Sequence, residues 1–177
     1  EKKAAEKKVA ATGGRAARMV DVESVEYNDS EATPEQYFQY KTDQKGNVTI
    51  TGFTGKMEEI AIPRKINDMP VRAIGKGAFQ GCKSLVRVTM PDSIDTMMGD
   101  AFRDCISLKN IHLSNAITKI VNSTFKGCIG LTELNIPDGV TELKQGTFKE
   151  SPITRLHIGR SLPTLDTRLC FRGESDR

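Results

Sequence analysis

The chain repeats itself every 23 residues, and this period limits the folds open to it more than any other feature. Phenylalanine recurs at four positions with this step, and cysteine and leucine each recur at three. The equivalent residues are Phe79, Phe102, Phe125 and Phe148; Cys82, Cys105 and Cys128; and Leu85, Leu108 and Leu131. Self-similarity at a fixed period of roughly 20–50 residues is typical of stacked repeats. The chain is therefore expected to fold as an array of coils.

The spacing within one repeat indicates how a coil is built. Each repeat contains a segment such as Leu85 to Met90, whose last two apolar residues are two positions apart and face one side of a strand. The preceding segment, around Phe79, is long enough for one helical or 3₁₀ turn. A single coil cannot bury its apolar residues, but a stack of coils forms a continuous core. We predict a solenoid of about five to six coils, with a parallel β-sheet on one face and short helical or 3₁₀ turns on the other.

The segments before the array differ from it in pattern. Residues 1–34 begin with an Ala-, Lys- and Glu-rich stretch that favours helix, which Gly13 and Gly14 interrupt. We predict a flexible, partly helical lead there. Residues 35–56 contain two short alternating runs around a Gly-containing turn, which is typical of a β-hairpin. We expect this hairpin to cap the array, which then spans residues 57–171 before a short tail at 172–177.

Charge and hydropathy argue against a nucleic-acid partner and against a membrane-spanning segment. The net charge is +3, but residues 1–20 alone carry six Lys or Arg against two Asp or Glu, so the rest of the chain is near neutral. A nucleic-acid-binding domain needs a basic stripe on a folded face, so we predict no nucleic-acid partner. No run of about 18 apolar residues is present, so we also predict no membrane-spanning segment.

The repeat resembles one known family. The segments AIGKGAFQGCKSL (residues 73–85) and VTMPDSI (88–94) are similar to the repeat of bacterial BspA-like proteins, the treponemal type of leucine-rich repeat. The segments VTITGFTG (48–55) and IPRKI (62–66) are similar to that family's first repeat, and the resemblance covers about residues 34–165. It implies a leucine-rich-repeat solenoid of the α/β type. It also implies a secreted, periplasmic or surface protein of a bacterium that adheres to host or matrix proteins, or to other cells.

The sequence offers no catalytic, cofactor or metal site. The repeated cysteines lack the C-x₂₋₄-C spacing of zinc ligands, and we predict that they are buried thiols. Cys170 lies outside the column and is the candidate for a reactive or intermolecular thiol. His112 and His157 are expected two coils and about 10 Å apart, each as an exposed polar residue. With no Ser-His-Asp arrangement and no phosphate-binding glycine loop, we predict a protein that is not an enzyme.

The outward side of the predicted sheet is the candidate protein-binding face, because it combines both charges with hydrogen-bonding groups. The alternative is that these are solvated strand residues without a partner. The residues of this face are Glu59, Arg87, Thr89, Asn110, His112, Glu133, Asn135, Arg155 and His157.

A second candidate surface is the apolar C-terminal end, formed by Leu162, Leu165, Leu169 and Phe171. An uncapped end of a solenoid tends to find cover. We expect it either to pack against a second copy or to fold back as its own cap. The sequence therefore leaves three functions open: an exported or surface-associated protein-binding module with a role in adhesion, a self-associating scaffold, and an intracellular interaction module.

Overall fold

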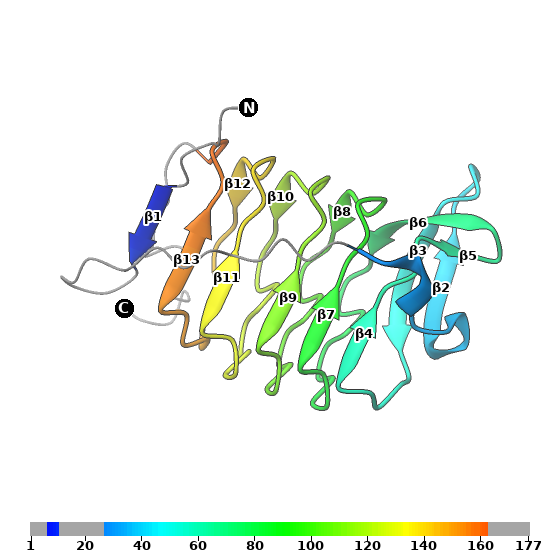
Figure 1. Cartoon of the computed structure of the whole chain (residues 1–177), viewed down its shortest axis with the longest axis horizontal. Helices are drawn as coiled ribbons and strands as arrows, with labels where there is room; N and C mark the ends of the chain where they lie inside the picture. The colour runs from blue at the N-terminus through cyan, green and yellow to red at the C-terminus, as the bar shows by residue number, and fades with distance from the viewer. Residues whose placement is uncertain (1–6, 11–26, 163–177) are drawn as a thin grey trace.

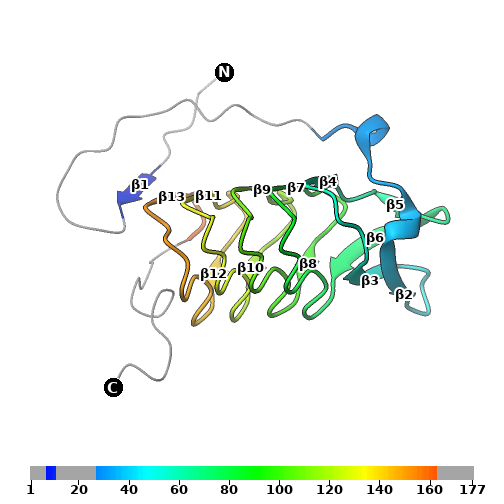
Figure 2. The same ribbon diagram turned by 90° about the horizontal axis from the view of Figure 1, so that it is seen from below.

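The computed structural model describes residues 7–10 and 27–162, which form a solenoid of about five coils (Figure 1). One strand of each coil lies on the same face, and together we call these strands the front sheet. They are β4 (Glu59–Ala61), β7 (Arg87–Thr89), β9 (Asn110–His112), β11 (Glu133–Asn135) and β13 (Arg155–Ile158). β4, β7 and β9 pair in parallel, as do β11 and β13, and the two groups lie side by side (Figures 1 and 2). The predicted parallel sheet is confirmed.

The opposite face carries a second row of shorter strands, which the sequence did not predict. These back strands are β8 (Thr96–Met97), β10 (Lys119–Ile120) and β12 (Glu142–Leu143). β10 pairs with β12 in parallel, and β8 pairs with β6 (Met69–Ile74). The predicted turns follow these strands as single turns, in which the Gln80 amide donates to Gly77 and the Cys82 amide to Phe79. The helices of the described residues, η1 (Asp29–Glu31) and η2 (Glu35–Tyr37), are 3₁₀ helices that precede the array.

The core between the two faces is a column of phenylalanine rings. Phe79 and Phe102 stack with their centroids 4.9 Å apart, and the column continues to Phe125 and Phe148 at 5.9 and 6.0 Å. All four side chains are fully buried. The spacing is close to the separation of neighbouring strands, about 4.8 Å, because each ring occupies the same position in successive coils. A chain without tryptophan thus obtains a continuous aromatic core.

A β-hairpin covers the N-terminal end of this column, as the sequence predicted. It consists of β2 (Phe38–Thr42) and β3 (Val48–Phe53), paired antiparallel. β3 continues in parallel to β6, which also pairs antiparallel with β5 (Lys65–Ile66). The rings of Phe38 and Phe53 lie 6.5 and 5.6 Å from that of Phe79. The hairpin therefore extends both the back layer and the aromatic core.

Residues 7–10 lie at the other end of the solenoid from the hairpin. Lys7–Ala10 forms strand β1, antiparallel to β13, within the lead that the sequence predicted to be flexible and partly helical (Figure 1). Helix propensity is a weak preference in so short a segment, and pairing with an open sheet edge outweighs it. The described chain resumes at Tyr27, whose hydroxyl donates to the Ile62 carbonyl beside β4 at 2.6 Å. Within residues 7–10 and 27–162, no helix is long and apolar enough to cross a membrane.

Candidate functional site

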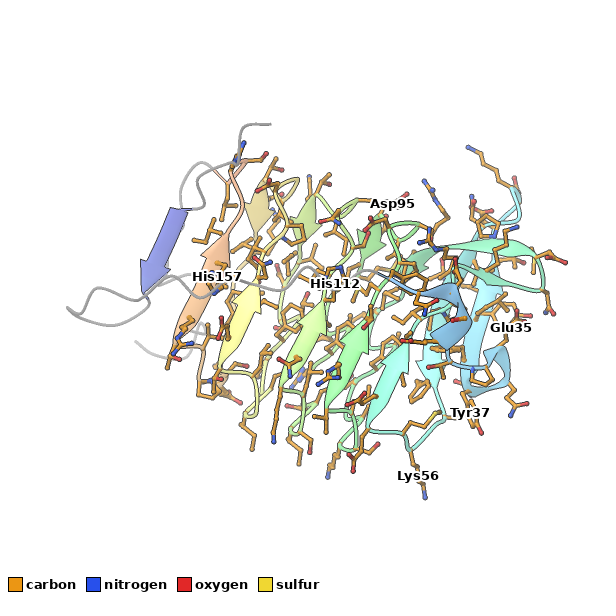
Figure 3. The ribbon with its side chains drawn as sticks, viewed as in Figure 1. Glu35, Tyr37, Lys56, Asp95, His112 and His157 are labelled. Atoms are coloured by element: carbon orange, nitrogen blue, oxygen red, sulfur yellow. The ribbon has the colours of Figure 1, made fainter. Side chains whose placement is uncertain are left out.

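The front sheet brings the predicted binding residues together. Parallel register places Arg87 beside Asn110 and Thr89 beside His112, because equivalent residues of successive coils are paired. Glu133 is likewise beside Arg155, and Asn135 beside His157. A shallow hollow of about 450 Å³ crosses β7, β9, β11 and β13. Of the nine predicted residues, all but Glu59 and Arg155 line it, and His112 and His157 are marked on this face in Figure 3.

The charged residues of this face neutralise one another across neighbouring strands. An Arg87 guanidinium nitrogen lies 3.4 Å from a Glu59 carboxylate oxygen, and Arg155 lies 3.3 Å from Glu133. These side chains are all about half exposed, so each pair contributes little to stability. Both arginines of the face therefore stand beside a carboxylate, and the face has no excess of positive charge to offer a polyanion.

His157 differs from the prediction that it would be an exposed polar residue. It is only 5% exposed, and its Nε2 lies 2.8 Å from a Glu133 carboxylate oxygen. Its strand, β13, is flanked by β11 on one side and by the backbone of β1 on the other, with Lys8 in register opposite His157. His157 is thus a buried wall of the hollow, whereas His112 remains partly exposed.

The middle of the hollow is lined by polar side chains that are neither carboxylates nor guanidinium groups. Asn110, His112 and Asn135 line it between the two ion pairs. In the part of the chain that the structure describes, their side chains make no hydrogen bond to protein. Each amide group offers two donors and an acceptor. The imidazole ring offers one donor and one acceptor in its neutral form and two donors in its protonated form. The arrangement can therefore hydrogen-bond to a neutral polar ligand that lies across the strands.

A smaller hollow of about 170 Å³ continues the first, beyond the ends of the strands. It shares Asn135 and His157 with the first and adds Asn115 and Asp138. The Asp138 carboxylate accepts the Arg160 amide of the next coil at 3.1 Å, as Asp92 accepts the Asn115 amide at 2.8 Å. The sequence analysis missed these residues. The signal was the Pro-Asp pair that recurs at 91–92 and 137–138.

Comparison with known families accounts for the repeat. Six copies of the BspA type Leucine rich repeat region match the sequence over residues 52–176. The chain belongs to this family. The resemblance drawn from the repeat segments is confirmed. A comparison with curated proteins finds no match.

Solved structures of bacterial leucine-rich-repeat proteins share the fold of this BspA-type array. A leucine-rich-repeat protein of T. pallidum is 30% identical with a TM-score of 0.66, over 69% of this chain and 58% of that one. A leucine rich cell surface protein of Faecalibacterium prausnitzii is 30% identical with a TM-score of 0.54, over 60% of this chain and 27% of that one. A leucine-rich-repeat protein of Bacteroides capillosus is 25% identical with a TM-score of 0.61, over 76% of this chain and 96% of that one. The chain thus spans 58% and 27% of the first two relatives.

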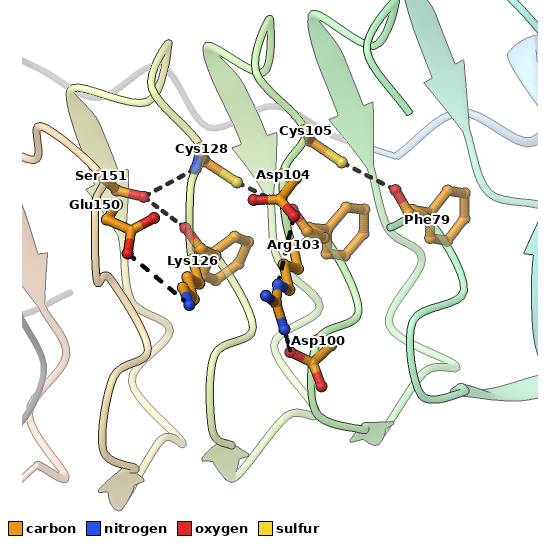
Figure 4. Close-up of polar contacts among 11 residues, drawn as sticks. Phe79, Asp100, Arg103, Asp104, Cys105, Lys126, Cys128, Glu150 and Ser151 are labelled. Carbon is orange, nitrogen blue, oxygen red and sulfur yellow. Dashed lines mark hydrogen bonds and ion pairs between the residues drawn. The ribbon is translucent and has the colours of Figure 1, made fainter. Parts of the chain in front are cut away.

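The cysteine column of the BspA-type array has a structural role (Figure 4). The Cys105 thiol donates to the Phe79 carbonyl of the preceding coil at 3.0 Å, and Cys128 donates to Phe102 at the same distance. Ser151 takes the next place in the column and donates to Phe125 at 2.5 Å. Burial raises the pKa of the Cys128 thiol to about 12 and also raises that of Cys105. The prediction of buried thiols is confirmed for these two residues.

The remaining predictions divide between described and undescribed residues. Cys82, the first of the column, is half-buried and therefore more accessible than expected. Leu162, from the predicted self-association end, packs against the core. Leu165, Leu169, Phe171 and Cys170 lie outside the described residues. Among residues 7–10 and 27–162, no group of three or more His, Cys, Asp or Glu side chains could hold a metal ion.

Proposed function

We propose that this chain is a non-enzymatic protein-binding module whose ligand lies in the hollow of the front sheet. The observation that supports the proposal is the combination of Asn110, His112 and Asn135 in one hollow, where their side chains make no hydrogen bond to residues 7–10 or 27–162 and ion pairs flank them. A protein backbone or a neutral polar side chain presents the donors and acceptors that such groups bind. Shape and hydrogen bonding, more than net charge, select the ligand.

The rigidity of the array favours this role. The residues of the hollow lie on parallel strands that stand on a fully buried core, so binding orders few groups that were mobile before. The hollow mixes polar groups with an apolar floor from Val88, Ile111 and Leu134, as protein interfaces do. Here the polar groups are suited to binding.

Adhesion at a bacterial surface is the setting that we propose for this binding. The relative from Faecalibacterium prausnitzii is described as a cell surface protein, and the family resemblance implies adhesion. Because the chain spans only 27% of that relative, its role there is carried over as a proposal. The scaffold alternative is a distinct outcome of the experiment below.

The test is a binding measurement with a front-face variant and a matched back-face control. The full chain would be measured against immobilised collagen, laminin and fibronectin. The front variant changes Asn110, His112 and Asn135 to Ala. The control changes Thr96, Lys119 and Glu142 of the back strands to Ala, which removes both partners of one ion pair.

We expect the front variant to lose at least about tenfold in affinity for any protein of the panel that binds, and the control to lose less than about twofold. Equal losses in both variants would contradict a site on the front sheet. Absence of binding to the whole panel, with the wild-type chain folded, would favour the scaffold alternative.

A further inference from the structure

Among residues 7–10 and 27–162, β13 is the last strand of the front sheet, and its outer edge is covered by the four residues of β1 (Figure 1). The pairing is antiparallel, with Lys7 opposite Ile158 and Ala10 opposite Arg155. Every other pairing within the front sheet is parallel. The array itself therefore continues by parallel strands, while its terminal edge accepts an antiparallel one.

The hydrogen bonds of β13 show which of its backbone groups face outward. The Arg155 amide donates to Thr132 at 3.1 Å, and the His157 carbonyl accepts from Ile136 at 2.8 Å, so residues 155 and 157 face β11. Backbone groups alternate along a strand. Leu156 and Ile158 therefore direct their N–H and C=O groups to the outer edge, where Val9 and Lys7 stand opposite them.

Without β1, the backbone groups of Leu156 and Ile158 would have no hydrogen-bond partner at this edge. A strand edge with unpaired backbone groups is a template for another strand, and natural proteins cover such edges to prevent association. We propose that the outer edge of β13 is an interface for a second copy of this chain, and that residues 7–10 control it by occupying the same edge. When β1 leaves, Leu156 and Ile158 lose their backbone partners. The same two residues of a second β13, placed antiparallel by a twofold axis, supply identical donors and acceptors.

A second copy fits this edge better than a chain that continues the array. Antiparallel pairing of two identical strands is symmetric, so one pairing satisfies both edges and the assembly closes at two copies. A parallel addition would leave a new open edge each time. The structure already shows that this edge takes an antiparallel strand in a defined register. The interface uses the backbone groups of Leu156 and Ile158, whereas the front hollow uses side chains, one of which is that of His157 on the same strand.

The test uses proline to remove a single backbone donor from β1 in the full chain. By the alternation above, the Val9 amide faces β13, whereas the Lys8 amide faces away. Val9→Pro therefore removes a hydrogen bond to Leu156 and adds a ring at the interface, while Lys8→Pro is the matched control. Both changes lie outside residues 27–162 and leave the array unaltered.

Two measurements decide the proposal. In light scattering across a hundredfold range of concentration, the wild-type chain and Lys8→Pro should stay monomeric, and Val9→Pro should become dimeric as concentration rises. In hydrogen exchange at low concentration, the Leu156 and Ile158 amides of Val9→Pro should exchange at least about tenfold faster than in the wild type. At high concentration their protection should return. The Phe102 amide, bonded to Thr124 at 3.0 Å, reports that the array stays folded.

A Val9→Pro chain that stays monomeric at every concentration, with both amides exposed, would overturn the second-copy interface. Equal exchange of Leu156 in the wild type and in Val9→Pro would overturn the control by residues 7–10. A wild-type chain as dimeric as Val9→Pro would also overturn it.

Discussion

The front and back of the solenoid are built from the same repeats, yet they differ in what they offer a ligand. A front strand such as β9 has three residues, so its first and third side chains both point outward. A back strand such as β10 has two, of which only Lys119 is exposed. Each coil thus adds two outward residues to the front and one to the back. One extra strand residue per coil is enough to turn a row of side chains into a two-column face with a hollow.

The two faces also differ in how their polar groups are satisfied. On the back, Arg72 and Asp95 form an ion pair at 2.5 Å, and Glu142 pairs with both Lys119 and Lys144. The Arg72–Asp95 and Lys119–Glu142 pairs join neighbouring coils. Hydrogen bonds from Lys144 and Lys119 lower the pKa of Glu142. On the front, charges pair at the margins, while the amides and the imidazole between them make no hydrogen bond to any described residue. The charged side chains of the back strands pair with one another, whereas the polar side chains of the front hollow can hydrogen-bond to a partner.

The largest expected effect concerns the core that both faces share. Phe102 stacks on Phe79 and Phe125, so Phe102→Ala should lower the free energy of unfolding by about 3–5 kcal/mol. Urea denaturation measures this change. The matched control, Asn110→Ala on the front surface, should change it by less than about 0.5 kcal/mol. A loss below about 1 kcal/mol for Phe102→Ala would contradict the role of the ring column.

Thiol reactivity should separate the buried part of the core from its accessible start. In a Cys170→Ser background, Cys82 should react with a disulfide reagent at pH 8 at least about a hundredfold faster than Cys128. Cys82 is half-buried, whereas burial raises the pKa of Cys128 to about 12 and leaves almost no thiolate at that pH. Mass spectrometry of the labelled chain identifies the site. Equal rates at both cysteines would show that the coils open readily.

The contact of Tyr27 with the coil of β4 should give a pH-dependent step in stability. Burial, aided by the charge of Asp29, raises the pKa of Tyr27 from 10.0 to about 12. Because the pKa of the phenol is higher in the folded state than in the unfolded state, its contribution to the free energy of unfolding is fully present below pH 10. This contribution is lost as the pH rises from 10 towards 12. Tyr27→Phe should remove this step and cost about 1 kcal/mol at neutral pH, through the lost hydrogen bond to Ile62. Denaturation at pH 9 and near pH 12 tests it, and an unchanged pH dependence in the variant contradicts it.

The smallest expected effect on stability is the most useful for comparing the faces. Arg87→Ala on the front and Arg72→Ala on the back each break an exposed ion pair, so each should cost less than about 1 kcal/mol. Only Arg87 lines the hollow, so only Arg87→Ala should also weaken ligand binding. Thermal denaturation and binding of the two variants would be measured together. A stronger loss of binding in Arg72→Ala would place the site on the back.

The repeat made most of the fold predictable, because its contacts occur between equivalent residues of adjacent coils. The column of Phe79, the parallel strands and the outward positions follow from spacing alone. The burial of His157 did not, because it depends on Glu133 and on strands at both sides of β13. Strand β1 pairs with residues far along the chain, and no local pattern in Lys7–Ala10 reports such a partner. The back strands escaped notice because two residues are too few for the alternation that marks a strand. Their only signal was the recurrence of Met97, Ile120 and Leu143 at the 23-residue step.

The central claim is that a protein ligand covers the front hollow, and a chemical footprint of the two histidines tests it most directly. His112 is partly exposed and His157 is buried, so diethyl pyrocarbonate should label His112 in the free chain. With a bound protein of the panel, we expect at least about tenfold slower labelling of His112. Acetylation of the back-strand Lys119 by acetic anhydride, measured in a separate reaction, should be unchanged. Protection of Lys119 with His112 labelled as in the free chain would contradict the central claim.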